Sequence, residues 1–289
     1  MHPTLDRLLR TTPVITDGAW GTQLQALGLP VGECPDGWNL SHPEKVRRVA
    51  QYYVDAGSNV ILTNTFRSNR IALEGFGLAD RVADINACGV RISLAAAGSR
   101  ATVLASIGPT GKMLMSEDVT AEEMASAFEE QAKALAEAGA AGLVIETMSD
   151  LEEAKLAVAA ARATGLPVVV SMVFDSGKEK DRTMMGSTPE QVAEELAAAG
   201  ADVIGANCGL GMKGYIPIAR RLRAATKLPV WIKPNAGLPE MINGAITYRT
   251  SPEEFATQAL ALREAGVAFI GGCCGTSPMF VQALAHTLR

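Results

Sequence analysis

Three cysteines are the residues of this chain whose type and placement most directly suggest chemistry. Cys208 follows a short apolar segment, and the adjacent pair Cys273 and Cys274 lies in the glycine-rich run 271–275. Adjacent side chains on a regular strand point to opposite faces, but glycines let the chain bend so that both sulfurs reach one point. Three thiolates form a soft site for which zinc is the expected metal, with a fourth position open. Alternatively, these are small buried cysteines that only pack at strand ends.

A second group of polar residues follows other apolar segments. Asp17, Asn64 and Glu146 each come directly after one segment. Further polar residues at or near the ends of such segments are Ser106, Asp175, Asn207 and Asn235. If the segments are parallel strands, these side chains gather at one edge of the sheet, where α/β enzymes place their active sites. Carboxylates, amides and thiols would then lie together at one open end of the fold, its mouth. Alternatively, Asp17 and Glu146 only tie strand ends to neighbouring loops.

The elements that must position these residues alternate regularly along the chain. Eight short apolar segments are separated by amphipathic helical stretches, and they span 14–16, 60–63, 103–106, 143–145, 168–172, 203–206, 230–233 and 267–271. Near-continuous apolar strands that alternate with helices indicate a parallel sheet covered on its outer face. Eight such units without a low-complexity linker predict a single (β/α)8 barrel domain over residues 1–289. A doubly wound open sheet is the alternative, but no G-x-G-x-x-G follows the first strand.

Helix boundaries can also be predicted from local signals. Capping boxes are expected at Ser41, Thr120, Thr188 and Ser251, each with Glu or Gln three residues later. Four helices are expected to end at a glycine just before a strand, and these are Gly57, Gly139, Gly200 and Gly266.

Composition limits the possible partners. The net charge of −5 argues against nucleic acid or an anionic membrane as a partner, because both demand clustered Lys and Arg. No apolar run approaches the roughly 18 residues that span a bilayer, and the first ten residues do not resemble a signal peptide. We therefore expect a cytoplasmic protein whose five cysteines are free, metal-bound or catalytic.

Taken together, several motifs resemble the homocysteine S-methyltransferase family. They are Asp17-Gly18-Ala19-Trp20-Gly21-Thr22, Ser41-His42-Pro43-Glu44, Thr63-Asn64-Thr65-Phe66, Ser106-Ile107-Gly108-Pro109, Ile145-Glu146-Thr147, Gly205-Ala206-Asn207-Cys208 and Gly271-Gly272-Cys273-Cys274-Gly275. That family includes the homocysteine module of cobalamin-dependent methionine synthase and the betaine– and S-methylmethionine–homocysteine methyltransferases. The resemblance covers essentially the whole chain, and the Asn-Cys and Gly-Gly-Cys-Cys-Gly combination is specific.

The resemblance implies a site and an activity. Cys208, Cys273 and Cys274 would be the zinc ligands, and Asn235 would be a fourth ligand when substrate is absent, although Asn235 also suits a turn after proline. Homocysteine would be methylated to methionine, with Asp17 and Glu146 binding its amino acid end. Charge-assisted hydrogen bonds from the substrate ammonium to these carboxylates would select an amino acid thiol.

The remaining substrate contacts are predicted on weaker patterns. Backbone N–H groups around Gly18 to Gly21 would hold the substrate carboxylate, and Asn64 is expected at the same mouth. Trp38 is expected in a loop over the mouth, where its ring would attract a small onium donor of the betaine or S-methylmethionine type. Alternatively, Trp38 only anchors the loop.

Other functions stay open at this point. The methyl donor could be a methylcorrinoid on a separate protein, because the sequence shows no folate or cobalamin domain, and Thr147 and Asn235 look more like the synthase. The chain could also be a non-catalytic zinc or redox-sensing barrel. A third alternative is a Schiff-base aldolase that uses Lys233.

Overall fold

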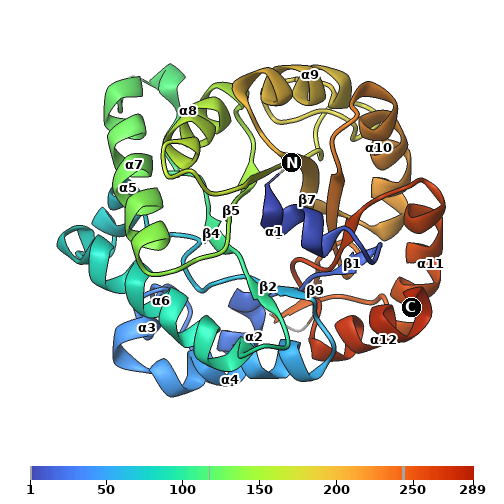
Figure 1. Ribbon diagram of the computed structural model, residues 1–289, viewed down its shortest axis with the longest axis horizontal. Coiled ribbons are helices and arrows are strands. Elements are labelled where there is room, and N and C mark those ends of the chain that lie inside the picture. The colour runs from blue at the N-terminus through green and yellow to red at the C-terminus, as the bar shows by residue number, and fades with distance from the viewer. Residues whose placement is uncertain (1, 117, 243–244) are drawn as a thin grey trace.

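The computed structural model describes residues 2–116, 118–242 and 245–289 and shows a parallel β-barrel surrounded by helices (Figure 1). Its strands lie where the apolar segments predicted them. They are β1 (Val14–Ile15), β2 (Val60–Ile61), β3 (Thr102–Val103), β4 (Ala105–Ile107), β5 (Leu143–Met148), β6 (Val168–Met172), β7 (Val203–Gly211), β8 (Val230–Asn235) and β11 (Phe269–Ile270). The predicted α/β barrel is confirmed.

The strands are joined into a ring by parallel pairing. Seven of them form a sheet in the order β1-β11-β8-β7-β6-β5-β4, and β2 pairs with β3. Only Leu104 separates β3 from β4, so these two are one interrupted strand. A parallel bridge between Thr16 and Val60 joins the first strand to the second, which completes the circle. Because all these strands are parallel, their C-terminal ends lie together at one end of the barrel, which we call the mouth.

Helices cover the outside of the barrel in chain order (Figure 1). They are α2 (Trp20–Ala26), α3 (Trp38–Ser41), α4 (Pro43–Asp55), α5 (Arg70–Glu74), α6 (Val82–Ala97), α7 (Ala121–Glu137), α8 (Leu151–Arg162), α9 (Pro189–Ala199), α10 (Met212–Ala225), α11 (Pro252–Glu264) and α12 (Pro278–Leu288), with short 3₁₀ turns η1 (Ala79–Arg81) and η2 (Leu114–Ser116). None of the helices in the described part of the chain combines the length and the apolarity needed to cross a membrane.

Most of the helix signals were predicted correctly. Thr120 and Thr188 form reciprocal capping boxes, and the Ser251 side chain accepts a hydrogen bond from the Glu254 N–H. The four predicted glycines all have positive φ angles, as a helix C-terminus requires. The box predicted at Ser41 is wrong, because Ser41 is the last residue of α3 and His42 occupies the N-cap of α4.

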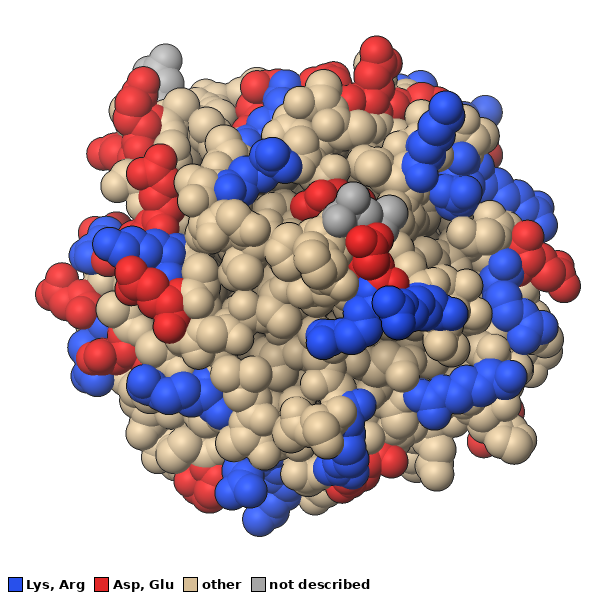
Figure 2. All heavy atoms as spheres, in the orientation of Figure 1, with Lys and Arg blue, Asp and Glu red and all other residues tan. Residues whose placement is uncertain are grey.

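The first helix, α1 (Pro3–Leu8), closes the end of the barrel opposite the mouth. Its Leu5 is fully buried among side chains that point into the barrel, including Val14, Trp231 and Phe269. Figure 1 shows α1 across the centre of this end, and Figure 2 shows acidic and basic side chains interspersed around it. Access to the barrel interior is therefore left to the other end.

One connection at the mouth has strands of its own. Between β8 and α11 the chain forms an antiparallel hairpin of β9 (Glu240–Ile242) and β10 (Ala245–Thr247). Tyr248 follows this hairpin and lies against the glycine-rich turn after β11, since a Cβ on Gly275 would stand 2.3 Å from the Tyr248 ring. The hairpin thus places an aromatic ring beside the cysteine pair.

Candidate metal centre and active site

Three sulfur atoms converge at the mouth, as the sequence predicted. Cys208 lies near the end of β7, and Cys273 and Cys274 lie in the turn after β11; both strands are neighbours of β8. The Sγ atoms of all three lie within 4.8 Å of one another, and those of Cys208 and Cys274 are 3.8 Å apart. The three thiols can therefore hold a single ion.

The glycine-rich turn makes this convergence of adjacent cysteines possible. The Cys273 N–H donates to the Pro234 carbonyl at 2.7 Å, and the Cys274 carbonyl accepts from the Ala236 N–H at 2.9 Å. Both bonds tie the turn to the end of β8. A Cβ on Gly271 would stand only 1.9 Å from the Thr16 hydroxyl oxygen, so this position has no room for a side chain.

Cys208 itself is held in an unusual backbone conformation. Its φ angle is +61°, and the pairing of β7 with β8 shifts register between Asn207 and Gly211. Thr147, directly after Glu146, has a φ angle of +63° at a similar irregularity in β5. Non-glycine residues in the left-handed region are uncommon, and bulges of this kind re-aim side chains at active sites.

The ionisation of the three thiols is mutually dependent. Hydrogen bonds from Cys273 and Cys274 lower the pKa of Cys208 to about 3, whereas donating to Cys208 raises the pKa of Cys273 to about 11. The pKa of Cys274 is raised for the same reason. Three thiolates at this spacing need a cation between them.

An oxygen ligand is also available beside the thiols. Asn235 ends β8, is 4% exposed, and has a side-chain oxygen that is buried without a hydrogen-bond partner. Its amide contacts Cys208, whose pKa it helps to lower. Three thiols and an unpartnered amide oxygen form a donor set that fits a thiophilic divalent ion such as zinc.

A buried ion pair lies deeper in the barrel. Lys233 Nζ donates to Asp17 Oδ1 at 2.6 Å, and both side chains are almost completely buried. Asp17 Oδ2 accepts from the Trp20 indole at 2.8 Å and from the Leu62 N–H at 2.7 Å. Burial lowers the pKa of Lys233, but the charges of Asp17 and Glu146 outweigh it, so the net shift is upward.

The Glu146 carboxylate accepts fewer hydrogen bonds than the Asp17 carboxylate. Among the described residues its one side-chain hydrogen bond comes from the Ser106 hydroxyl, at 2.5 Å. Burial raises the pKa of Glu146 to about 7, although the nearby Lys233 charge opposes the shift. The second carboxylate oxygen is free to accept a proton donor from a ligand.

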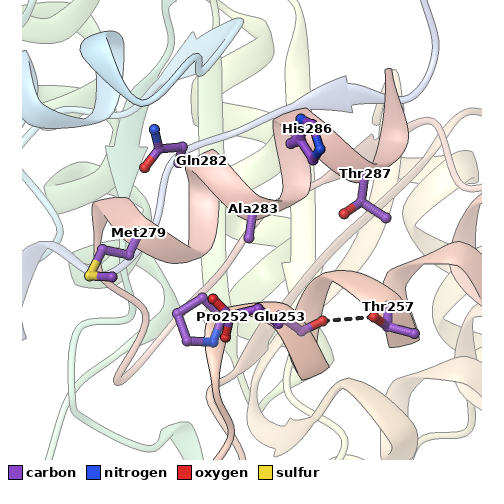
Figure 3. Close-up of a pocket in the computed structure, with 8 residues that line it drawn as sticks. All are labelled: Pro252, Glu253, Thr257, Met279, Gln282, Ala283, His286 and Thr287. Atoms are coloured by element: carbon purple, nitrogen blue, oxygen red, sulfur yellow. Dashed lines mark hydrogen bonds between the residues drawn. The ribbon is translucent and has the colours of Figure 1, made fainter.

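Most of these groups line one pocket at the mouth, which has a volume of about 840 Å³. The residues of its wall that bear on chemistry are Gly18, Trp20, Asn64, Phe66, Glu146, Lys233, Tyr248, Cys208, Cys273 and Cys274. Asp17 and Asn235 are buried and are not part of the wall, although Lys233 and Trp20, which donate hydrogen bonds to Asp17, both are. A smaller surface hollow of about 410 Å³ lies between α11 and α12 (Figure 3) and contains none of the predicted site residues.

Two predicted residues have surroundings that the sequence did not indicate. The expectation that Trp38 lies in a loop over the mouth is wrong: it begins α3, is 2% exposed, and packs between His42 and the Lys45 ammonium. Asn64 does reach the pocket, but its amide donates to the Pro35 carbonyl and to Asn39, so it also holds the loop before α3.

The sequence did not predict how three residues shape the pocket, although Lys233 was considered as a Schiff-base lysine. Lys233 is a charged residue within an otherwise apolar barrel strand, which is a signal of a buried partner or ligand. Trp20 lines the pocket and donates a hydrogen bond to Asp17, a role that its place in the motif did not indicate. Tyr248 follows a hairpin that no periodic pattern indicated.

Comparison with known proteins agrees with this geometry. The sequence model of the family described as homocysteine S-methyltransferase matches residues 14–288. Methionine synthases of Mycobacterium tuberculosis and Mycobacterium leprae are each 30% identical over 94% of this chain. The chain spans about a quarter of the length of these curated relatives, 24% in each case.

A solved structure has the same fold. The metallated form of the homocysteine methyltransferase MmuM from Escherichia coli superposes with a TM-score of 0.82, covers 99% of both chains and is 21% identical. At this identity the match shows the barrel fold alone.

Proposed function

The chain belongs to the homocysteine S-methyltransferase family, and we propose that it methylates the thiol of homocysteine to form methionine. The observation that carries this proposal is the cluster of Cys208, Cys273 and Cys274, whose sulfurs lie within 4.8 Å of one another in the wall of the mouth pocket. The same wall carries Glu146 and Lys233, charged groups suited to a zwitterionic substrate.

Zinc is the metal that we propose for the three thiols, with the Asn235 oxygen completing the set before the substrate arrives. Zinc bound there would keep the substrate sulfur in its thiolate form, which is the nucleophile. Asn207 holds Cys273 in place by donating to its sulfur at 3.7 Å. The Tyr248 ring packs against the turn at Gly275, directly after the cysteine pair.

The amino acid end of homocysteine is placed by the deeper polar groups. Glu146 accepts hydrogen bonds from the substrate ammonium, and the backbone at Gly18 lies in the same wall. Asp17 acts indirectly, by holding Lys233 and Trp20 in place, because its carboxylate already accepts hydrogen bonds from Lys233, Trp20 and the Leu62 N–H. These contacts leave the thiol directed toward the cysteines and the donor toward the open mouth.

For the donor, we propose a small onium compound of the betaine or S-methylmethionine type. The wall of the pocket also carries the aromatic rings of Trp20, Phe66 and Phe76 together with the carboxylate of Glu33. Aromatic faces and carboxylates both attract methylammonium and sulfonium groups. The methyl group passes to sulfur, the donor keeps the electron pair of the broken bond, and both products lose their charge at the reacting atoms.

A second candidate donor is a methylcorrinoid carried by a separate protein. The apolar rim of the mouth, defined as Val31, Met115, Met184, Leu238 and Met241, supports it, since each of these side chains is more than half exposed. All five lie in connections that follow the C-terminal ends of strands, on the face where the pocket opens. Exposed apolar surface of this kind is typical of a protein contact.

A donor panel tests the proposal. Zinc-loaded protein is given homocysteine with betaine, S-methylmethionine, a dimethylsulfonium acid or a methylated corrinoid protein, and methionine is quantified for each. Methionine from one of the first three donors supports the onium proposal, and methionine from the last alone supports the second candidate. No methionine from any donor, combined with zinc release on oxidation, would instead favour a non-catalytic redox-sensing barrel.

A further inference from the structure

Lys233 has hydrogen-bonding capacity that its buried partner does not use. Its ammonium carries three N–H groups, and among the described residues it donates one hydrogen bond, to Asp17 Oδ1. The Lys233 side chain is 3% exposed, yet it forms part of the wall of the mouth pocket. The remaining N–H groups are therefore available to a ligand in that pocket.

Asp17 fixes where this ammonium lies. Its carboxylate accepts from Lys233 on one oxygen and from Trp20 and Leu62 on the other. With these three donors in place, Asp17 holds Lys233 rigidly at the pocket and remains behind the wall. Burying an ion pair costs more free energy than apolar packing of the same volume, so its presence at a pocket suggests a binding role.

The strand register relates Lys233 to the metal centre. Trp231, Lys233 and Asn235 are every second residue along β8, so their side chains lie on the same face of the strand. Because Trp231 packs inside the barrel, all three side chains face inward. Asn235 contacts Cys208 at the mouth. Lys233 is two residues deeper, about 6.6 Å along the strand. Two methylene groups between a bound sulfur and an α-carbon can bridge this separation.

We propose that Lys233 is a substrate-binding residue whose ammonium pairs with the α-carboxylate of the thiol acceptor, while Glu146 takes the α-ammonium. This inference rests on the proposed function and sharpens it, because it restricts the acceptor to thiols with a free α-amino acid group. Lys233 and Glu146 then form complementary charges for a zwitterion, and Asp17 is a positioning residue for Lys233.

A purely structural role for Lys233 makes a different prediction. If Lys233 only neutralised Asp17 inside the barrel, its replacement would weaken the binding of all thiols to the same extent. A carboxylate contact instead weakens only ligands that carry a carboxylate. The two explanations are separated by comparing ligands, even where a variant is less stable.

The test is calorimetric binding to the zinc-loaded full chain, without a methyl donor. The ligands are homocysteine, 3-aminopropane-1-thiol, which lacks the carboxylate, and 4-sulfanylbutanoate, which lacks the amine. Wild-type protein should bind homocysteine at least about tenfold more tightly than either analogue, as expected for a charge-assisted contact. Lys233→Met should abolish the preference over 3-aminopropane-1-thiol and keep the preference over 4-sulfanylbutanoate, and Glu146→Gln should show the reverse.

Each outcome decides the proposal. Equal wild-type affinity for homocysteine and 3-aminopropane-1-thiol would overturn the carboxylate contact, while methionine formation would leave the proposed function intact. An unchanged preference in Lys233→Met would overturn it as well. Should that variant fail to retain zinc or to fold, Lys233→Gln, which keeps a polar group but removes the charge, is measured with the same three ligands. It too should lose the preference over 3-aminopropane-1-thiol, and an unchanged preference would overturn the proposal. Failure of every thiol to bind would overturn the proposed function itself.

Discussion

Asn207 and Thr147 hold each other at two points across the mouth of the barrel. The Asn207 side-chain oxygen accepts from the Thr147 N–H at 2.8 Å, and its amide nitrogen donates to the Thr147 hydroxyl at 2.7 Å. Thr147 directly follows Glu146, and Asn207 directly precedes Cys208. This reciprocal pair therefore connects the end of β5, which carries Glu146, to the end of β7, which carries Cys208. One member of the pair, Thr147, and the neighbour of the other, Cys208, have left-handed backbone.

The first prediction concerns Asn207. Asn207→Ala removes both bonds to Thr147, the bond from Ser171 and the donor to the Cys273 sulfur. Zinc affinity should fall about 10- to 100-fold, the usual effect of losing an outer partner of a metal ligand. Competition with a chromophoric chelator measures it. Asn207→Asp keeps the acceptor oxygen and should lose less; equal affinities of the alanine variant and wild type would refute the positioning role.

The second prediction concerns the ligands. Cys208→Ala, Cys273→Ala and Cys274→Ala should each abolish zinc retention after dialysis and reduce methionine formation below detection, because each removes one of three thiolates. Elemental analysis and product quantification measure the two effects. Cys88→Ser is the matched control, since Cys88 lies on α6 and should keep full zinc content. If any of the three alanine variants retained zinc and full activity, its assignment as a ligand would be wrong.

The sequence contained enough information for the barrel because its strands are buried on both sides. Such strands are short apolar runs between helices, so 168–172 could be located to the residue and the others within a few positions. The cysteines could be grouped because their type limits their chemistry. The strand signal is local in sequence, whereas the cysteine signal lies in residue type.

The features that were missed depend on contacts between distant segments. The left-handed backbone of Thr147 and Cys208 lies where the strand pairing is irregular. Neither residue type predicts such an irregularity. The Lys233–Asp17 pair joins residues at opposite ends of the chain. Trp38 was misplaced because the segment before it looks like a loop, whereas the four-residue helix α3 turns its ring inward.

The third prediction concerns pH. Burial raises the pKa of Asp36 from 3.8 to about 7, despite hydrogen bonds from the Arg67 N–H and the Ser68 hydroxyl. Between these values the folded protein keeps a proton that the unfolded chain loses, so the free energy of unfolding decreases as pH rises. The slope from this group is at most about 1.4 kcal/mol per pH unit.

Asp36→Asn tests this slope, because asparagine keeps an acceptor for Arg67 and Ser68 but does not titrate. Urea unfolding of both proteins is compared at pH 5 and pH 7. Wild type should lose roughly 2 kcal/mol more than the variant over this interval. Parallel pH dependence of the two proteins would show that Asp36 stays ionised throughout.

The fourth prediction concerns the turn that carries the cysteine pair. Gly271→Ala would place a Cβ 1.9 Å from the Thr16 hydroxyl oxygen and 2.7 Å from the Asp17 carbonyl, both in the neighbouring strand end. The turn must shift, so the free energy of unfolding should fall by about 1–3 kcal/mol. Because Cys273 follows two residues later, zinc affinity should fall with it. Gly21→Ala is the control, since nothing lies within 4 Å of its Cβ and α2 should tolerate alanine. Urea unfolding and chelator competition measure both variants; a Gly271→Ala protein as stable as the control would mean that the turn has room to adapt, and the close packing inferred for it would be wrong.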